Sequence, residues 1–160
     1  MTLPPFQALL DEHAPDLHRY LVASVGVHDG ADAFQETVVA ALRAYPRLER
    51  DDNLRGWLFT IAHRKVIDGA RARGRRAVPV AEVPEAPAVE PRDASGDGVV
   101  WAAVRGLPPK QRSAVVQRFL LDRPYAEIAE TLECSEDAAR QSVRAGLQRL
   151  RRELPEEVRA

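Results

Sequence analysis

Side chains able to bind a polyanion recur at helical spacing near the C-terminus of the chain. Arg140, Arg144, Gln148 and Arg151 follow one another at steps of four, four and three residues, which places them along one face of a helix. Arginine and glutamine can present forked donors to purine edges in the major groove of DNA, and further arginines can bind phosphates. The same pattern is also typical of an amphipathic helix with a solvated arginine face. Spacing alone leaves both interpretations open.

A helix-turn-helix would position this face. Ile128, Ala129 and Leu132 predict a short first helix with a small residue where the two helices touch. Ser135 is a suitable N-cap for the second helix, which has an apolar stripe formed by Ala139, Val143, Leu147, Leu150 and Leu154. The turn falls at Glu133, although glycine adopts a positive φ most easily. Glutamate can adopt this conformation at some cost in strain, so the sequence allows the turn of a helix-turn-helix without indicating it.

Charged residues are distributed in blocks, although the net charge is only −1. Residues 1–54 hold 4 basic and 9 acidic side chains, residues 64–76 hold 6 basic and 1 acidic, and residues 140–152 hold 5 basic and none acidic. Two basic patches divided by acidic sequence suit two contacts with one polyanion better than one continuous basic surface.

A proline-rich, acidic stretch at residues 77–98, "AVPVAEVPEAPAVEPRDASGDG", separates two helical regions. Its four prolines remove backbone donors and favour extended conformations, so we expect a semi-rigid linker. Ala, Leu, Arg and Glu abound and no useful alternating strand pattern occurs, which indicates an all-α fold. The predicted architecture is therefore two small helical domains, residues 1–76 and 99–160, joined by this linker.

Three helices are predicted in the first domain. An apolar stripe over residues 6–25 indicates the first, which we expect Pro15 to kink or split. The second begins near Asp29 and ends before Pro46, with a buried face formed by Phe34, Val38, Ala41, Leu42 and Tyr45. The third begins at Asn53 as N-cap, and Trp57 is expected in its core-facing stripe. In the second domain, Pro108 and Pro109 mark a helix whose apolar face includes Val115, Val116, Phe119 and Leu120.

Composition argues against several classes of protein. The chain is 45% hydrophobic and 29% charged, which suits a folded soluble domain, and its single cysteine, Cys134, excludes an internal disulfide. Neither a secretory signal nor an apolar run of about 20 residues occurs, so we expect a cytoplasmic protein without membrane insertion. The four histidines show no metal-ligand spacing, and no nucleophile motif or phosphate-binding glycine loop is present. No catalytic residue, metal or cofactor is predicted, and an enzyme is the least supported class.

Three segments carry a resemblance to a known family. "LPPKQRSAVVQRFLLDRPYAEIAETLECSEDAARQSVRAGLQRLRREL" closely resembles the C-terminal promoter-binding domain of extracytoplasmic-function (ECF) RNA polymerase sigma factors, within the primary-sigma superfamily. "DGADAFQETVVAALRAYPRL" resembles the polymerase-binding helix of that family, and "NLRGWLFTIAHRKVIDGARARGRR" resembles its helix for the promoter −10 element. The segments stand in the expected order around a variable linker, so the resemblance covers nearly the whole chain.

The resemblance assigns roles to individual residues. Those expected to face the polymerase are Asp29, Asp32, Gln35 and Glu36. Those expected at the −10 element are Asn53, Arg55, Thr60, His63, Arg64, Lys65, Arg71, Arg73, Arg75 and Arg76. Those expected at the −35 element are Arg112, Tyr125, Arg140, Gln141, Arg144 and Arg149. Ser142 and Ala145 stand where relatives often carry arginine, so the −35 set is thinner in this chain.

The implied function is promoter recognition and opening by a sigma factor. The implied partners are core RNA polymerase, through its β′ clamp helices and β flap, promoter DNA, and an anti-sigma factor as a further candidate. Two other classes stay open. A stand-alone helix-turn-helix regulator would explain residues 125–154 but not the acidic second helix. A helical adaptor without DNA contact would keep its function after Arg140 and Arg144 are neutralised.

Overall fold

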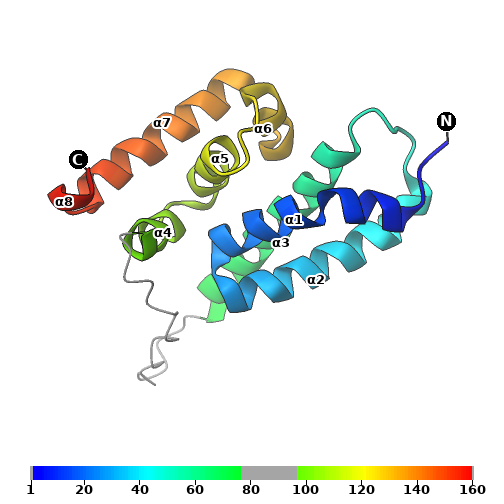
Figure 1. Ribbon diagram of the computed structural model, residues 1–160, viewed down its shortest axis with the longest axis horizontal. Coiled ribbons are helices and arrows are strands. Elements are labelled where there is room, and N and C mark those ends of the chain that lie inside the picture. The colour runs from blue at the N-terminus through cyan, green and yellow to red at the C-terminus, as the bar shows by residue number, and fades with distance from the viewer. Residues whose placement is uncertain (1, 77–96, 160) are drawn as a thin grey trace.

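The computed structural model describes residues 2–76 and 97–159, and every regular element within them is a helix (Figure 1). The predicted all-α class is confirmed. The first half contains α1 (Phe6–Val25), α2 (Val27–Ala44), the short 3₁₀ helix η1 (Tyr45–Arg47) and α3 (Leu54–Arg76). The second half contains α4 (Asp97–Arg105), α5 (Pro109–Phe119), α6 (Tyr125–Leu132), α7 (Glu136–Glu153) and α8 (Glu156–Arg159). The predicted linker lies outside the described residues, except for its last two positions, which belong to α4.

Local sequence signals determine where several helices begin. The Asn53 side-chain oxygen accepts a hydrogen bond of 3.0 Å from the backbone N–H of Gly56. Ser135 accepts one of 3.1 Å from the N–H of Ala138. Both are N-caps that satisfy a backbone donor otherwise left free at a helix start. Pro109 occupies the first turn of α5, where its missing N–H has no consequence. These predicted helix starts are confirmed.

The predicted interruption at Pro15 does not divide the first helix. α1 runs without a break from Phe6 to Val25 with Pro15 inside it. Pro15 lies on the exposed side of the helix, as does Asp11, whose carbonyl loses its usual helical donor. Because water can satisfy that carbonyl, the helix tolerates the proline, and the expected split was wrong.

The first two helices pack unusually closely. Gly26 has φ 91°, a conformation that glycine adopts without strain, and it separates α1 from α2. At Gly30, a Cβ atom would lie 2.9 Å from the Cα of Val22. The absent side chain therefore lets the two backbones approach. Further along α2, Leu42 was predicted to be buried but is 54% exposed, because Ala41 and Tyr45 fill the core beside α1 and α3 instead.

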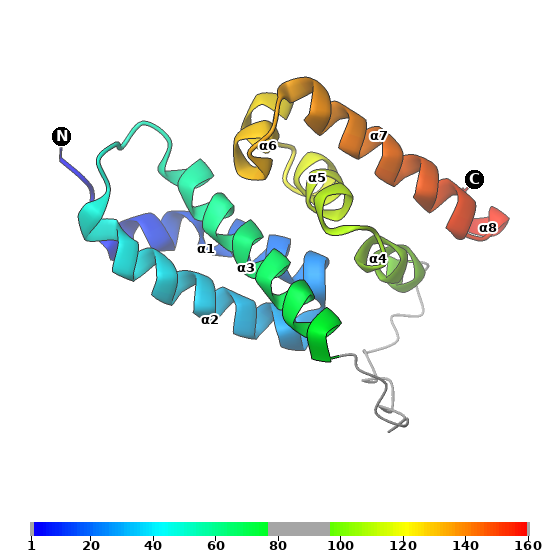
Figure 2. The same cartoon turned by 180° about the vertical axis from the view of Figure 1, so that it is seen from behind.

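The two halves of the described chain share one buried hydrophobic cluster. Leu17, Tyr20 and Phe59 contribute to it from the first half. The second half contributes Val104, Leu107, Val115, Val116 and Leu150. Figures 1 and 2 show α6 lying beside α3, and α5 beside α1. The predicted helical halves therefore form a closed arrangement in which each covers part of the other.

None of the helices in residues 2–76 and 97–159 combines the length and apolar character needed to cross a membrane. Over the same residues, no group of three or more His, Cys, Asp or Glu side chains could hold a metal ion.

Candidate nucleic-acid interface

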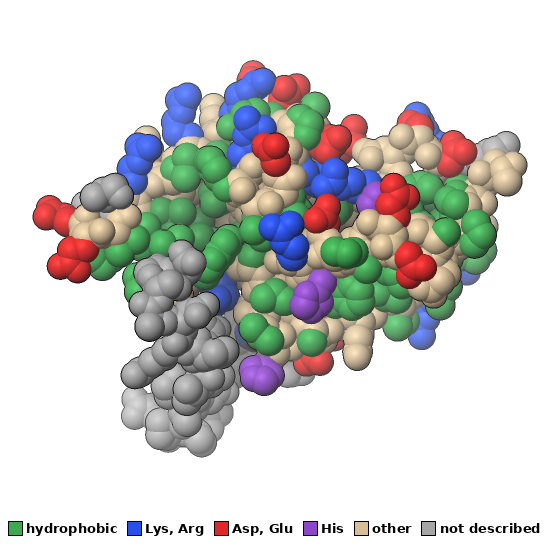
Figure 3. All heavy atoms as spheres, viewed as in Figure 1, with side chains coloured by type: hydrophobic (Ala, Val, Ile, Leu, Met, Phe, Trp, Pro, Cys, Tyr) green, Lys and Arg blue, Asp and Glu red, His purple; other side chains and the backbone are tan. Residues whose placement is uncertain are grey.

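The predicted arginine face lies on the outer surface of α7. Arg140, Arg144, Gln148 and Arg151 are exposed and line a shallow groove of about 420 Å³ together with Tyr125. Lys and Arg side chains stand out along α7 in the space-filling view (Figure 3). One face of α7 therefore carries these donors toward solvent, as their spacing predicted.

The start of α7 holds its first arginine in place. Arg140 donates to Glu136 at 2.8 Å and to Asp137 at 3.2 Å, both in the first turn of the same helix. The guanidinium of Arg140 also lies 5.2 Å from the ring centroid of Tyr125, and Arg118 lies 4.5 Å from the same ring. Cation–π contacts of this kind orient a cation without neutralising it. Arg118 was not predicted, because its position beside Tyr125 depends on how α5 meets α6.

The turn between α6 and α7 adopts the left-handed conformation that the sequence allowed. Glu133 has φ 55° and ψ 46°, the left-handed region, and its N–H is bonded to the carbonyls of Ala129 and Glu130. Ala129, Ile128 and Leu132 are buried against Ala139 and Val143 of α7. The helix-turn-helix and its strained turn are therefore both present in the structure.

Two further −35 candidates, Gln141 and Arg149, lie on α7. Arg149 donates to Glu153 at 2.8 Å, one turn further along α7. Gln141 is exposed. Both side chains are accessible, although Arg149 must leave Glu153 to contact a ligand.

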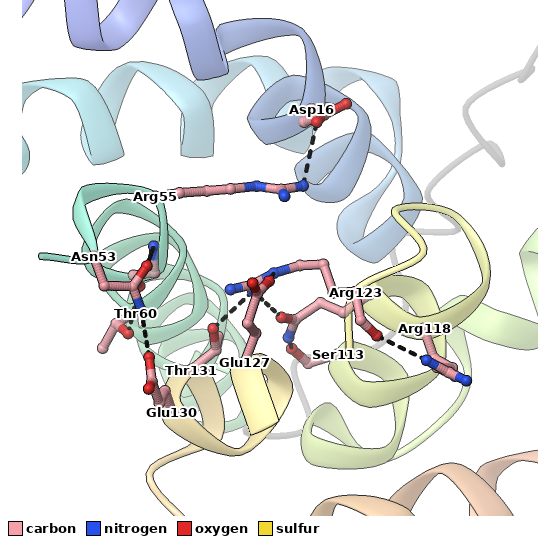
Figure 4. A network of polar contacts seen from close by, with 12 residues as sticks. Asp16, Asn53, Arg55, Thr60, Ser113, Arg118, Arg123, Glu127, Glu130 and Thr131 are labelled. Carbon is pink, nitrogen blue, oxygen red and sulfur yellow. Dashed lines mark hydrogen bonds and ion pairs between the residues drawn. The ribbon is translucent and has the colours of Figure 1, made fainter. Parts of the chain in front are cut away.

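Two −10 candidates on α3 face the second half of the chain. Asn53 donates through its side-chain amide to the carboxylate of Glu130, and Arg64 donates to the carboxylate of Glu133. Figure 4 shows the first of these contacts, between the start of α3 and α6. Both donors are therefore occupied by acids of the helix-turn-helix.

Other −10 candidates have contacts within the first half. Arg55 extends toward α1, where it forms an ion pair of 3.4 Å with Asp16 (Figure 4). The Thr60 hydroxyl donates to the carbonyl of Gly56 at 2.8 Å. Arg55 therefore joins α3 to α1, whereas Thr60 bonds within its own helix. Sequence reasoning assigned both residues to DNA and did not anticipate these contacts.

The basic end of α3 is solvent-exposed and lies next to α2. Arg71 and Arg73 are exposed, and Arg73 lies 3.7 Å from Asp29. Lys65 is half-buried and lines a pocket of about 170 Å³ between α2 and α3. The backbones of Arg75 and Arg76 end the helix, whereas their side chains lie outside the described part of the chain.

His63 and Arg112, both predicted DNA contacts, are buried where the halves meet. His63 lies 3.4 Å from the Tyr20 hydroxyl, and burial lowers its pKa to about 4, assisted by Lys110, Arg112 and Arg64. Arg112 is 8% exposed and donates to the Ser24 carbonyl at 2.7 Å. Both side chains are largely covered in this arrangement, because each half packs over the other.

The four polymerase candidates lie together on the exposed side of α2. Asp29, Asp32, Gln35 and Glu36 all face solvent. Further along the helix, Val39 is 45% exposed, and it lines a groove of about 370 Å³ with Gln35, Glu36 and Arg43. Exposed apolar side chains bordered by charges are typical of protein-binding surfaces.

Comparison with known protein families gives two matches in chain order. Residues 9–76 match the family described as Sigma-70 region 2, and residues 98–150 match Sigma-70, region 4. The ECF RNA polymerase sigma factor SigL of Mycobacterium tuberculosis is 30% identical over 158 residues, which cover 94% of this chain and 89% of SigL. The chain belongs to the ECF sigma factor family. Proteins of this family are transcription initiation factors and not enzymes.

A second ECF sigma factor, SigE of Mycolicibacterium smegmatis, is 29% identical over 160 residues. The match covers 93% of this chain and 61% of SigE, so the chain spans less than two thirds of that relative. A solved structure of the sigma factor RpoE in complex with the anti-sigma factor NepR, from Bartonella quintana, has the same fold. Its TM-score is 0.76 at 23% identity, over 92% of this chain and 94% of that one.

The site residues divide cleanly between the two sigma regions. Region 2 of this ECF sigma factor contains the α2 and α3 candidates, and region 4 contains α6 and α7 up to residue 150. The pairs that join Asn53 to Glu130 and Arg64 to Glu133 therefore run between region 2 and region 4.

Proposed function

We propose that this ECF sigma factor binds core RNA polymerase, recognises the −10 and −35 elements of a promoter, and promotes promoter opening. The observation that supports this most is the exposed donor row of α7 on a helix-turn-helix within region 4. A second set of DNA-facing candidates, on α3, belongs to region 2. A chain of almost zero net charge has little electrostatic attraction to DNA. Joining two modest DNA contacts in one chain, held by polymerase, would raise the overall affinity.

At the −35 element, α7 would enter the major groove. Arg140, Gln141 and Arg144 lie in its first half, where a recognition helix contacts base edges. To bind guanine, Arg140 must give up its hydrogen bonds to Glu136 and Asp137 and donate to the base instead. Only a well-placed acceptor can compensate for the lost bonds, so the two acids would make Arg140 more selective. Arg149 and Tyr125 would position the helix on the phosphate backbone.

At the −10 element, α3 would contact a separated strand. Asn53 supplies an amide and Arg64 a guanidinium, which suit an unstacked base and its neighbouring phosphate. The basic end of α3, including Arg71 and Arg73, would bind further phosphates. On the same half, the exposed acids of α2 would contact the polymerase β′ clamp helices, and region 4 would contact the β flap.

An anti-sigma factor is a further proposed partner. The support is by similarity of fold, because the RpoE structure of Bartonella quintana contains the anti-sigma factor NepR. A partner of this kind would have to cover or lock surfaces that polymerase also uses.

The test is transcription in vitro from a pool of promoter fragments, with bacterial core polymerase and with or without this chain. We expect new start sites that require the chain and are lost in Arg140→Ala/Arg144→Ala. The matched control is Arg19→Ala/Arg50→Ala, which removes the same charge from exposed positions of the first half and should preserve those transcripts.

The other outcomes identify other functions. No new transcripts, together with no binding to core polymerase, would contradict the proposal. Specific DNA binding in that case would identify a stand-alone helix-turn-helix regulator. Absence of DNA binding, with activity unaffected by the double variant, would identify an adaptor.

A further inference from the structure

The aromatic ring of Tyr125 lies beside two arginines that come from different helices. The guanidinium of Arg118, near the end of α5, is 4.5 Å from the ring centroid, and that of Arg140, on α7, is 5.2 Å from it. The face of an aromatic ring carries partial negative charge, so it attracts a cation without removing the cation's charge. The ring therefore connects the first arginine of the exposed α7 face to α5.

The surrounding chain fixes the position of this ring. Tyr125 is the first residue of α6, and its side chain packs against the buried cluster that includes Ala114 and Ile128. Arg118 is itself held, because its guanidinium donates to the backbone carbonyl of Arg123 at 3.1 Å (Figure 4). The ring is therefore a rigid support for an arginine side chain that reaches it.

Arg140 is held from two directions, whereas the next arginine along the same face is not. Its guanidinium donates to Glu136 and Asp137 of its own helix and lies near the Tyr125 ring of α6. Arg144, one turn further, is exposed and forms no hydrogen bond or ion pair with the described residues of the chain. A long side chain that is already ordered loses less conformational entropy when it binds. Arg140 is therefore the better prepared of the two arginines to bind in one direction.

We propose that Tyr125 is a positioning residue for Arg140, and that its ring determines how strictly one base pair of the −35 element is recognised. This rests on the proposed function of α7 at the −35 element. To donate to a base, Arg140 must leave Glu136 and Asp137. It does not have to leave the ring, because the ring attracts the guanidinium charge and leaves its N–H donors free. A guanidinium held in one direction can form both bonds of a bidentate contact with guanine at one base pair only, so other bases there are disfavoured.

This role differs from a contact with the DNA backbone. A side chain that binds phosphate supports every DNA sequence alike. A side chain that directs a base-contacting arginine changes the preference at one base pair and leaves the other positions as they were. The two roles of Tyr125 can therefore be separated by measuring preference and affinity together.

The first measurement follows the Arg140 side chain in the intact chain, without DNA or polymerase. Nitrogen-15 relaxation of its Nε–H group reports how mobile the guanidinium is on the picosecond to nanosecond timescale. Tyr125→Phe keeps the ring and removes the hydroxyl, whereas Tyr125→Leu removes the ring and keeps an apolar side chain on the same buried cluster. We expect Arg140 to stay ordered in Tyr125→Phe and to become more mobile in Tyr125→Leu. Arg144 should be equally mobile in all three proteins.

The second measurement is selection from double-stranded DNA with a randomised −35 element, by core polymerase that carries this chain. Arg140→Ala identifies the base pair that Arg140 contacts. At that base pair, we expect Tyr125→Leu to lower the preference for the best base by about two- to fivefold, the range of an exposed cation–π contact, and Tyr125→Phe to retain it. The matched control Arg149→Ala removes a proposed phosphate contact, so it should weaken binding to all sequences and preserve every preference.

Two results would overturn the proposal. One is an Arg140 side chain that is as ordered in Tyr125→Leu as in the unmodified chain. The other is an unchanged base preference in Tyr125→Leu with weaker binding to all sequences, which would make Tyr125 a phosphate contact only. If the unmodified chain enriches no sequence, the proposed function fails, and the recognition of a base pair fails with it. The relaxation of Arg140 still decides in that case whether the ring positions it.

Discussion

Arg112 of α5 donates a hydrogen bond of 2.7 Å from its guanidinium to the backbone carbonyl oxygen of Ser24, one residue before the end of α1. The same guanidinium donates to the Leu107 carbonyl at 3.3 Å. A cation buried at the negative end of α1 is favourably placed, because that end carries unpaired carbonyls. Arg112 therefore joins region 2 to region 4 in the closed chain.

Replacing Arg112 should weaken the contact between the halves. Arg112→Ala leaves the Ser24 and Leu107 carbonyls without this donor, and we expect a loss of about 2 kcal/mol in the free energy of unfolding. Urea denaturation measures it. Lys110→Ala, an exposed neighbour on the same helix, should change stability by less than about 0.5 kcal/mol. Equal stability of the two variants would show that Arg112 does not hold the halves together.

His63 predicts a particular dependence of stability on pH. Burial, with the nearby cations Lys110, Arg112 and Arg64, lowers its pKa to about 4, while Glu133 opposes the shift. The unfolded chain takes up a proton near pH 6.5, so the stabilisation is complete above that pH and is lost as pH falls toward 4. From pH 7 to pH 5, we expect His63 to lower the free energy of unfolding by about 2 kcal/mol.

The matched variant for this effect is His63→Gln, which cannot titrate. Urea denaturation at pH 7 and pH 5 should show a smaller loss of stability in His63→Gln than in the unmodified chain. Carboxylates contribute equally to both proteins and cancel in the comparison. Parallel losses in the two proteins would contradict a buried, neutral His63.

Arg123 should be among the most sensitive single positions in the second half. It is 1% exposed, donates to Thr131 at 2.9 Å and to Glu127 at 3.2 Å, and also donates to Gln117 (Figure 4). Its guanidinium lies 4.7 Å from the ring centroid of Phe59 on α3. Arg123→Ala would leave buried polar groups unpaired and should cost about 3 kcal/mol in thermal or urea unfolding.

A lysine at the same position gives the informative comparison. Arg123→Lys keeps the charge but lacks the planar fork that reaches several acceptors at once, so we expect stability between that of the alanine variant and the unmodified chain. Full retention of stability by Arg123→Lys would indicate that charge alone matters at this position.

Two glycines should respond in opposite directions to alanine. At Gly30 the new Cβ would lie 2.9 Å from the Val22 Cα, so α1 and α2 must separate, and we expect a loss of roughly 1–3 kcal/mol. At Gly69 the nearest atom is the Arg73 Nη1 at 3.8 Å, and alanine should stabilise α3 by about 0.5–1 kcal/mol. Thermal melting of the two variants, side by side, tests both. A Gly30→Ala protein as stable as Gly69→Ala would contradict the close approach of the first two helices.

Local chemistry made much of the fold predictable from the sequence. Asn53 and Ser135 mark helix starts because their side chains bond to backbone donors two or three residues later. The two helices of the helix-turn-helix followed from their apolar faces, Ile128 and Leu132 on the first and Val143 and Leu147 on the second. The left-handed turn at Glu133 was allowed by the sequence but not indicated by it, because no glycine stands there. The exposed face of α7 followed from the spacing of its arginines.

The sequence could not determine which polar side chains the two halves bury. His63 and Arg112 have the residue types and the positions of DNA contacts, yet both are covered in the closed chain. Tyr20 meets Ser113 across 93 residues of sequence, and no periodic pattern within either helix encodes that pairing. Leu42 and Phe119, both predicted to be buried, are 54% and 62% exposed because the neighbouring helices pack against other faces.

The sequence by itself therefore determined the helices, their caps, the helix-turn-helix and the donor face of α7. These depend on residues within about four positions of one another, where backbone geometry fixes the distances. Only the tertiary structure decided that Glu130 and Glu133 pair with Asn53 and Arg64. That pairing depends on how the surface of one half packs against the surface of the other. The packing is decided by the shape and the buried area of both surfaces together, and no local sequence pattern encodes it.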